Sequence, residues 1–254
     1  MILGGVTINP VSPAAPVTTP DGPANLRDVR GLRTDDGRIV RRGVLYRSEV
    51  PRSVRAGGSD VAIWPPATVI DLRSPEEFAG PHALGPVADV HSVPLGRSLA
   101  PALAAEQTDD NDLAWAYRHL VQDAAGEIAR IVALVASGPG PVLVHCTAGK
   151  DRTGIVVAVL LRAVGVCRAD VVADYLRTEA NLPQLWAALH GAGVPTPRNR
   201  ALLGVQAGAL EAVLDEVEAA PGGVAGWLTA HGVQPSDLER LSERLLSAVY
   251  APAR

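Results

Sequence analysis

The sequence predicts an α/β protein whose central, mainly parallel sheet has four or five strands and is flanked by helices. Three observations support this fold class. The apolar run at residues 142–145 is bounded by a proline and a glycine-containing loop, which is typical of a buried strand. Residues 68–72 form a second run of this kind, and residues 113–135 repeat apolar side chains at helical spacing. Strands that alternate with helices favour a parallel sheet.

The chain opens with a segment of turn-forming residues. Residues 1–24 contain five prolines and three glycines, so we expect an extended N-terminal segment there. At 254 residues the chain could form one large domain or two small ones, and we interpret residues 25–254 as a single domain.

Four segments are expected to form strands: residues 43–48, 68–73, 88–95 and 142–145. Asp71 and Arg73 stand at the carboxyl end of the second strand, two residues apart and therefore on one face. If the strands are parallel, this end lies on the same rim as the residues after position 145. Ligands bind at that rim in open α/β sheets.

Helical spacing, glycines and prolines predict the other elements. The helix at 113–135 leads through a Gly-Pro-Gly sequence to the strand at 142–145. The next helix begins near Thr153 and ends at Gly165, because glycine is favoured just after a helix. Further helices are expected at residues 170–178, 182–190, 200–219, 224–231 and 236–250.

The turn after the strand at 142–145 carries the chemistry. Its sequence is Cys146-Thr147-Ala148-Gly149-Lys150-Asp151-Arg152-Thr153, with five residues between the cysteine and the arginine. A loop of this length at a helix N-terminus can turn successive backbone N–H groups inward, and such a nest binds anions. The same field favours a thiolate over a thiol. We therefore expect Cys146 to be a nucleophile, and the amides of residues 147–152 to bind a phosphate.

Side chains near this loop have expected roles. The planar guanidinium of Arg152 suits two phosphate oxygens and the charge that develops during phosphoryl transfer. The Thr153 hydroxyl can donate a hydrogen bond to the departing sulfur, and His145 is expected to orient the loop backbone. The leaving oxygen needs a proton donor. Asp151 is the first candidate because it lies inside the loop, and Asp71 is the second; for Asp71 a role in positioning Arg152 and a purely structural ion pair stay open.

The cysteine, the arginine and the following threonine resemble the signature of the cysteine-dependent protein tyrosine phosphatases. The longer string His145-Cys-x-Ala-Gly-Lys-Asp-Arg-Thr-Gly154 is similar to the atypical bacterial branch, the PtpB-like tyrosine and phosphoinositide phosphatases. The segments at 25–29 and 71–73 also match motifs of this family, although Arg30 replaces a glycine that usually follows the first motif. The resemblance extends over residues 25 to about 249.

This resemblance implies the cysteine-phosphatase fold and hydrolysis of phosphomonoesters through a phosphocysteine intermediate, without a metal or other cofactor. The implied substrates carry phosphotyrosine, phosphoserine or phosphothreonine, or are phosphoinositides. Arg47 lies near the phosphate site in the family, although an arginine on the surface of an edge strand is an equal alternative. In these relatives a pair of helices from the region of residues 182–235 covers the active site as a lid.

Three other interpretations stay open. Cys146 can be a buried structural thiol. The chain can bind phosphate without turnover, or it can be a rhodanese-type sulfurtransferase, which also has a cysteine loop on an α/β fold. Hydrolysis of an aryl phosphate and a thiosulfate assay distinguish these functions.

Lys150 is the only lysine among the 23 basic residues, and it stands in the loop. Since arginine supplies every other cation, we expect this lysine to have a specific role: its ammonium contacts a second anionic group, such as another phosphate on an inositol ring. A solvated loop charge is the alternative.

Composition sets limits on partners and compartment. A net charge of −4 argues against nucleic acid or an anionic membrane as an electrostatic partner, and 47% hydrophobic residues suffice for a core. No apolar run approaches the ~20 residues that span a bilayer. Two cysteines 21 residues apart do not form a disulfide framework, and no secretory signal is evident. We expect a cytoplasmic enzyme, with signal-less secretion open as in PtpB-like relatives; the oligomeric state is not predicted.

Overall fold

The computed structural model describes residues 22–55, 58, 60–78, 80–101 and 112–248, so the extended segment expected at residues 1–24 falls almost entirely outside the described residues. Within the described part, five strands form one sheet in the order β1-β2-β5-β3-β4. Their bounds are β1 (Arg27–Asp28), β2 (Leu45–Ser48), β3 (Thr68–Asp71), β4 (Asp89–Ser92) and β5 (Val142–His145). Only the pairing of β1 with β2 is antiparallel. The predicted fold class is confirmed.

The strands divide the apolar side chains between two cores, because successive residues of a strand point to opposite faces. The larger core lies between the sheet and the helices; its strand residues are Leu45, Ile70, Val142 and Val144. On the other face, Tyr46, Val69 and Leu143 pack against loop residues, which include Leu26, Leu84 and Trp64. The main helical layer therefore covers one face, and loops cover the other.

The helix predicted at 113–135 is in fact two helices, and this prediction was wrong. Helix α2 (Leu113–Asp123) ends at Ala124, whose φ of −113° and ψ of 24° are not helical, and α3 (Ala125–Ser137) follows. Each helix packs on a different partner: α2 on α7 (Ala207–Glu218) and α3 on α9 (Pro235–Leu245). Packing in two directions breaks the helix, and Gly126 beside the break has low helix propensity.

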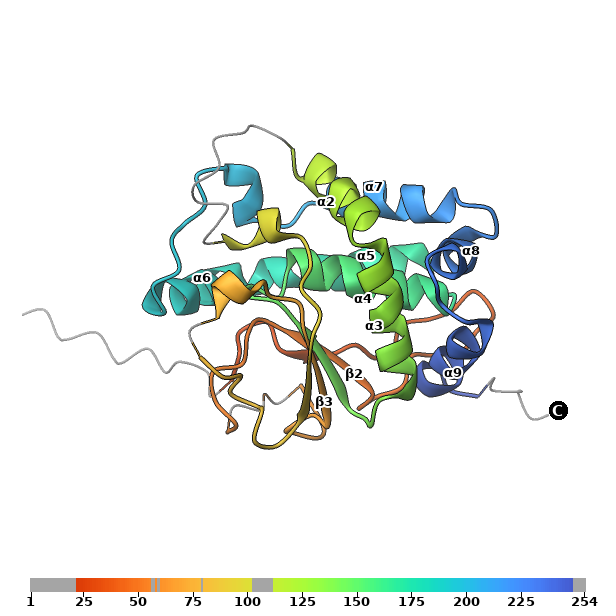
Figure 1. The fold of residues 1–254 in the computed structure, drawn as a ribbon, viewed down its shortest axis with the longest axis horizontal. Coiled ribbons are helices and arrows are strands. Elements are labelled where there is room, and N and C mark those ends of the chain that lie inside the picture. Colours follow the sequence, from red (N-terminus) through yellow and green to blue (C-terminus); the bar gives the residue numbers. More distant parts are fainter. Residues whose placement is uncertain (1–21, 56–57, 59, 79, 102–111, 249–254) are drawn as a thin grey trace, which may run out of the picture.

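The helix after the loop agrees with the sequence prediction. Helix α4 (Asp151–Ala163) is followed at Gly165 by a φ of 82°, the left-handed conformation that favours glycine. It packs on α5 (Arg168–Leu176). In Figure 1, α2 and α3 run past α4, and α8 and α9 lie at one end of the helical layer.

The C-terminal third is mostly core rather than cover. Helices α7 and α8 (Gly223–Ala230) contribute Leu210, Val213 and Leu228 to the larger core. The helix predicted at 200–219 is interrupted, because Gly204 is extended between a short 3-10 helix, Arg200–Leu203, and α7. Helix α6 (Leu182–Gly191) packs on the loop after β5, through Ala148. The lid prediction therefore concerns α6 and the segment that follows it. No helix within the described ranges is long and apolar enough to cross a membrane.

Candidate active site

The loop of residues 146–150 lies where β5 ends and α4 begins, at the carboxyl rim of the sheet. Gly149 has a φ of +66°, and a Cβ added there would lie 2.2 Å from the Ser48 carbonyl carbon. Only glycine permits this close approach of two backbone segments. The loop is therefore built against the end of β2.

Two side chains hold the outer side of the loop at Gly149. Its carbonyl oxygen accepts hydrogen bonds from Asn25 Nδ2 at 3.0 Å and from an Arg47 NH2 donor at 3.2 Å. A trans peptide points its N–H opposite to its C=O. With the Gly149 carbonyl held outward, the N–H of Lys150 points into the loop.

Two further carbonyls are held outward in the same way. His145 Nδ1 lies 3.1 Å from the Cys146 carbonyl oxygen, and the Val50 N–H donates to the Thr147 carbonyl at 3.3 Å. The N–H groups of Thr147 and Ala148 consequently point inward. The loop therefore presents a concave set of amides to an anion.

The Cys146 side chain is only 2% exposed, a degree of burial that would also suit a structural thiol. Cys146 belongs to the larger hydrophobic core, but polar groups also act on its sulfur. The Gly149 N–H donates to Sγ at 3.2 Å, and the positive charge of Arg152 acts on the sulfur. The sulfur therefore faces both a hydrogen-bond donor and a cation.

Arg152 is fully buried and is held by a carboxylate that the sequence analysis missed. Its two terminal nitrogens donate to the two oxygens of Glu77 at 2.6 and 2.7 Å. Burial would raise the pKa of Glu77, but the hydrogen bonds and charge of Arg152 outweigh this, and the pKa is lowered. The signal in the sequence was a capping box, because the Glu77 side chain also accepts from the backbone N–H of Ser74.

Two polar groups at the start of α4 lack a hydrogen-bond partner within the described part of the chain. Arg152 Nε and Thr153 Oγ1 are buried and have no hydrogen-bond partner among the described residues. Buried polar groups without a partner are rare and call for an explanation. A bound phosphate would supply an acceptor for Arg152 Nε, and the departing sulfur would supply one for Thr153.

Lys150 and Asp151 are paired with each other on the inner side of the loop. Lys150 is 1% exposed, and its Nζ donates to both Asp151 oxygens at 2.7 Å. The Tyr117 hydroxyl also donates to Asp151 at 2.6 Å and contacts the Tyr175 hydroxyl at 2.8 Å. Burial and the charge of Asp151 raise the pKa of Tyr117, so this phenol is a firm donor. In this structure the ammonium of Lys150 is turned toward a carboxylate of its own loop.

Asp71 lies on the rim that the sequence predicted, since it is in register with His145 on the neighbouring strand. Its carboxylate accepts from Arg73 Nε at 2.9 Å and from the terminal nitrogen of Arg73 at 2.7 Å. Burial alone would raise the pKa of Asp71, but His145 in its protonated form lowers it, as do the hydrogen bonds and the charge of Arg73.

Arg47 lies behind the loop. It is buried and forms an ion pair with Asp174 at 2.8 Å, besides its bond to Gly149. It therefore touches the outer side of the loop, opposite the side to which the amides point.

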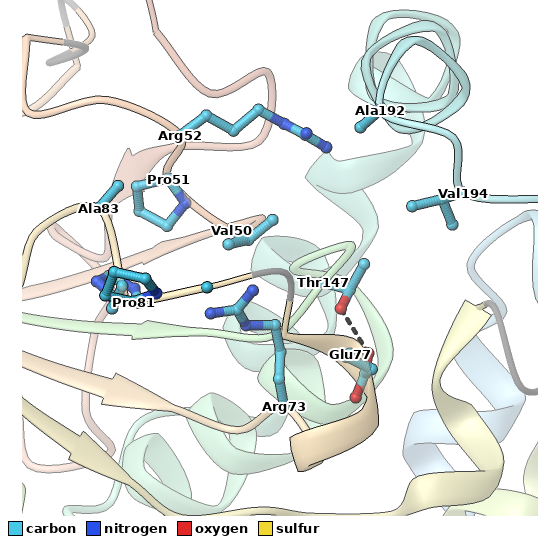
Figure 2. Close-up of a pocket in the computed structure, with 12 residues that line it drawn as sticks. Val50, Pro51, Arg52, Arg73, Glu77, Pro81, Ala83, Thr147, Ala192 and Val194 are labelled. Carbon is cyan, nitrogen blue, oxygen red and sulfur yellow. Dashed lines mark hydrogen bonds between the residues drawn. The ribbon is translucent and has the colours of Figure 1, made fainter.

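A cleft of about 390 Å³ lies beside the loop at Thr147. Its lining residues are Val50, Pro51, Arg52, Arg73, Glu77, Gly80, Pro81, His82, Ala83, Thr147, Ala192 and Val194. Figure 2 shows Arg52 reaching across the cleft toward Ala192, and the Thr147 hydroxyl bonded to Glu77. Two arginines in an apolar surround suit an anionic ligand with an apolar body.

Comparison with known proteins identifies the family. The model of the Tyrosine phosphatase family matches residues 19–247. The chain belongs to the tyrosine phosphatase family. Triple specificity protein phosphatase PtpB of Mycobacterium tuberculosis is 32% identical over 89% of this chain and 97% of its own length. A Cupriavidus necator protein is 32% identical over 81% of this chain and 80% of its own length, and a tyrosine-protein phosphatase of Nostoc commune is 37% identical over 44% and 41%.

Membership of the tyrosine phosphatase family makes this chain a phosphatase that acts on phosphorylated substrates, and it favours that function over sulfur transfer. The structure brings together most of the residues predicted for the site: Cys146, Thr147, Ala148, Gly149, Arg152, Thr153, His145 and Asp71 lie at one rim. Lys150, Asp151 and Arg47 adjoin the loop but are engaged in buried ion pairs.

Proposed function

We propose that this phosphatase hydrolyses phosphotyrosine in proteins through a phosphocysteine on Cys146. The observation that supports this most strongly is the loop itself, in which three carbonyls are held by partners on one side, so that their amides point to the other. Arg152, whose charge acts on Cys146, has a buried Nε without a partner among the described residues. Such preorganised donors stabilise charge that develops on a transferring phosphoryl group.

The first step forms the S–P bond and breaks the P–O bond to the substrate. The amides of residues 147–152 and Arg152 stabilise the equatorial oxygens, and the leaving oxygen takes a proton. In the second step the carboxylate that donated its proton takes one from water, the water oxygen bonds to phosphorus, the S–P bond breaks, and inorganic phosphate and the thiolate are released. Thr153 Oγ1, which has no other partner among the described residues, donates to that sulfur. The route needs no metal or cofactor.

Asp151 is the proposed proton donor, ahead of Asp71. Arg73 keeps the pKa of Asp71 low, so this carboxyl is ionised at neutral pH and is a poor acid. Asp151 lies in the first turn of α4, within the loop. In this structure its oxygens accept from Lys150 and Tyr117, so proton donation requires that the Lys150 contact opens.

Substrates with different leaving groups test this assignment. A good leaving group such as p-nitrophenolate needs no acid, whereas the tyrosine phenolate does. Asp151→Asn should therefore lower the turnover of phosphotyrosine far more than that of p-nitrophenyl phosphate. Equal losses for both substrates, or the selective loss in Asp71→Asn instead, would assign the acid elsewhere.

The cleft supports a wider substrate range. Arg52 and Arg73 can attract a second anionic group of the substrate, such as a phosphate of a phosphoinositide or an acidic residue beside a phosphorylated side chain. The relative PtpB is described as a triple specificity protein phosphatase. We propose phosphoserine, phosphothreonine and phosphoinositides as further substrates.

We also propose a cytoplasmic location for the protein.

Lys150 reaches a second phosphate only if its ion pair with Asp151 opens. The test compares kcat/KM for a phosphotyrosine peptide, a phosphoserine peptide and a phosphoinositide in wild type, Lys150→Ala and Arg52→Ala. A phosphoinositide-selective loss in Lys150→Ala supports the second-phosphate role. A loss confined to Arg52→Ala assigns that role to the cleft.

The purified protein tests the function directly. Wild type should hydrolyse a phosphotyrosine peptide, and Cys146→Ser should bind that peptide without turning it over. Binding without turnover in wild type would identify a pseudophosphatase, and retained turnover in Cys146→Ser would exclude the covalent route.

A further inference from the structure

We propose that His82 is a positioning residue for the nucleophile: its hydrogen bond to His145 fixes the ring tautomer that orients the Cys146 carbonyl. The inference rests on the proposed cysteine mechanism and extends it to a residue outside the signature loop. His82 lies between β3 and β4, in the turn at residues 80–84 that lines the cleft.

The hydrogen-bond partners assign the protons of both rings. The Leu84 N–H donates to His82 Nδ1 at 3.1 Å, so this nitrogen is bare and the neutral ring carries its proton on Nε2. His82 Nε2 lies 2.9 Å from His145 Nε2. His145 must carry its proton on Nδ1, because its partner there is the Cys146 carbonyl oxygen, which can only accept. The Nε2 of His145 is therefore an acceptor, as the proton of His82 requires.

The other pair of tautomers, in which His145 donates to His82, does not fit the hydrogen-bond partners of either ring. A proton on His145 Nε2 would leave a bare Nδ1 against the Cys146 carbonyl. It would also place a proton on His82 Nδ1, against the Leu84 N–H. Each mismatch leaves buried polar groups without a hydrogen-bond partner, which destabilises that pair of tautomers. Only one relay, from Leu84 through His82 and His145 to Cys146, satisfies every donor.

The charged groups around the two rings agree with neutral histidines. Burial lowers the pKa of His82, although the charge of Asp71 acts to raise it, and burial lowers the pKa of His145 to about 4. A shared cation is a weaker explanation, although ligand atoms of Asp71, His82 and His145 lie within 4.8 Å of one another. Ligation by His82 Nε2 would move its proton to Nδ1, which Leu84 occupies, and the Asp71 oxygens already accept from Arg73.

The relay matters because the Cys146 carbonyl and the Thr147 N–H belong to one peptide. While His145 holds the carbonyl outward, the N–H points at the phosphate. Without a donor on its Nε2, His145 is free to take the other tautomer, and the Cys146 carbonyl loses its partner. His82, which lies in a turn that lines the cleft, thereby controls the direction of the Thr147 N–H.

Three substitutions of His82 separate this role from a structural one. In His82→Gln the side-chain amide nitrogen reaches the place of Nε2 and can donate to His145. In His82→Asn the amide oxygen takes the place of Nδ1 and can accept from Leu84, but nothing reaches His145. His82→Phe keeps the ring volume and removes both bonds. His231→Gln, a replacement on the last turn beyond α8, is the matched control.

We expect kcat for a phosphotyrosine peptide to fall about tenfold in His82→Asn and His82→Phe, the usual scale for residues that orient a reacting group. KM should change little, and His82→Gln should retain most of the activity, as should His231→Gln. Alkylation of Cys146 by iodoacetamide should move to higher pH in the Asn and Phe variants. Activity retained in Asn but lost in Gln, equal loss in both, or no loss in any variant would overturn the proposal.

A readout without turnover keeps this proposal separate from the proposed function. Nitrogen-15 NMR of labelled histidines reports which ring nitrogen of His145 carries the proton, even if the protein hydrolyses no substrate. Wild type and His82→Gln should show a protonated Nδ1, and His82→Asn and His82→Phe a changed or mixed tautomer. An unchanged His145 spectrum in all variants would contradict the relay.

Discussion

Glu77 determines how the central cation of the site is held. It binds both terminal nitrogens of Arg152 and accepts a hydrogen bond from Thr147, so one carboxylate fixes a guanidinium and the first side chain of the loop. These two bonds occupy the terminal nitrogens and leave Arg152 Nε without a partner among the described residues, so we expect the carboxylate to act on catalysis by orienting this guanidinium. Removal of its charge should show whether this orientation matters.

We predict that Glu77→Gln lowers kcat/KM about 10- to 100-fold, because an amide oxygen cannot hold both arms of the guanidinium. Glu76→Gln is the control, since Glu76 forms a half-exposed ion pair with Arg97. Equal activity of Glu77→Gln and wild type in a phosphotyrosine assay would contradict the role.

The same carboxylate has a predictable pH signature in stability. The folded pKa of Glu77 is lowered from its ordinary value of 4.5, so its charge stabilises the fold above that pH. This contribution is lost as the pH falls through the folded pKa. The difference in Tm between wild type and Glu77→Gln should therefore be largest near neutral pH and shrink below about pH 4.5.

Gly149 offers a second test at the scale of one residue. Gly149→Ala places a Cβ 2.2 Å from backbone atoms, so the loop must move and its amides lose their direction; we expect a loss of at least about 100-fold in kcat/KM. Gly165→Ala has a similar positive φ but open space, so it should cost about 1–2 kcal/mol in stability and leave activity intact. Similar activities of the two variants would contradict this account.

At the scale of elements, α5 is fastened to the first two strands by buried charges. Asp174 in α5 pairs with Arg27 of β1 at 3.1 Å and with Arg47 of β2 at 2.8 Å. Burial, with the nearby charge of Arg47, lowers the pKa of Arg27 to about 10. Burial would raise the pKa of Asp174, but the two arginines lower it. Since Arg47 also holds the loop, this cluster joins three elements to the site.

Removal of the Asp174 carboxylate, which both arginines share, should therefore destabilise the fold strongly. Asp174→Asn leaves two buried guanidinium groups without their anion, and we predict a loss of about 3–5 kcal/mol in the free energy of unfolding. Asp215→Asn removes an exposed partner of Arg168 and should cost less than about 1 kcal/mol. Urea unfolding measures both, and equal costs would contradict a special role for the cluster.

At the scale of the whole molecule, the helices after the loop belong to the same core as the sheet. Trp227 of α8 lies in the larger core with strand residues, whereas Trp64 packs on the opposite face. We therefore propose one cooperative domain rather than a catalytic unit with a separate helical tail. Thermal or urea unfolding followed by tryptophan fluorescence and by circular dichroism should give coincident single transitions. Two separated transitions would show that the chain unfolds as two independent units and would contradict the proposal of one cooperative domain.

The sequence predicted four of the five strands and the turn between β5 and α4, because a buried strand and a glycine-bearing turn are local patterns, whereas the two-residue strand β1 was not predicted. Glu77 escaped notice because its bond to Arg152 spans 75 residues, and local spacing does not report such pairs. The break at Ala124 escaped for a related reason: helical periodicity identifies the buried face but not the direction of each partner helix. Lys150 was recognised as unusual by composition, yet composition could not show that its ammonium turns toward Asp151.

The most direct test of the account is to trap the covalent intermediate. Wild-type protein mixed with a phosphotyrosine peptide and quenched with acid within one turnover should yield a peptide, identified by mass spectrometry, that carries one phosphoryl group on Cys146. The Cys146→Ser variant should bind the substrate and show no turnover. Substrate turnover by wild type with no phosphoryl group on Cys146, or turnover by Cys146→Ser, would contradict the proposed mechanism.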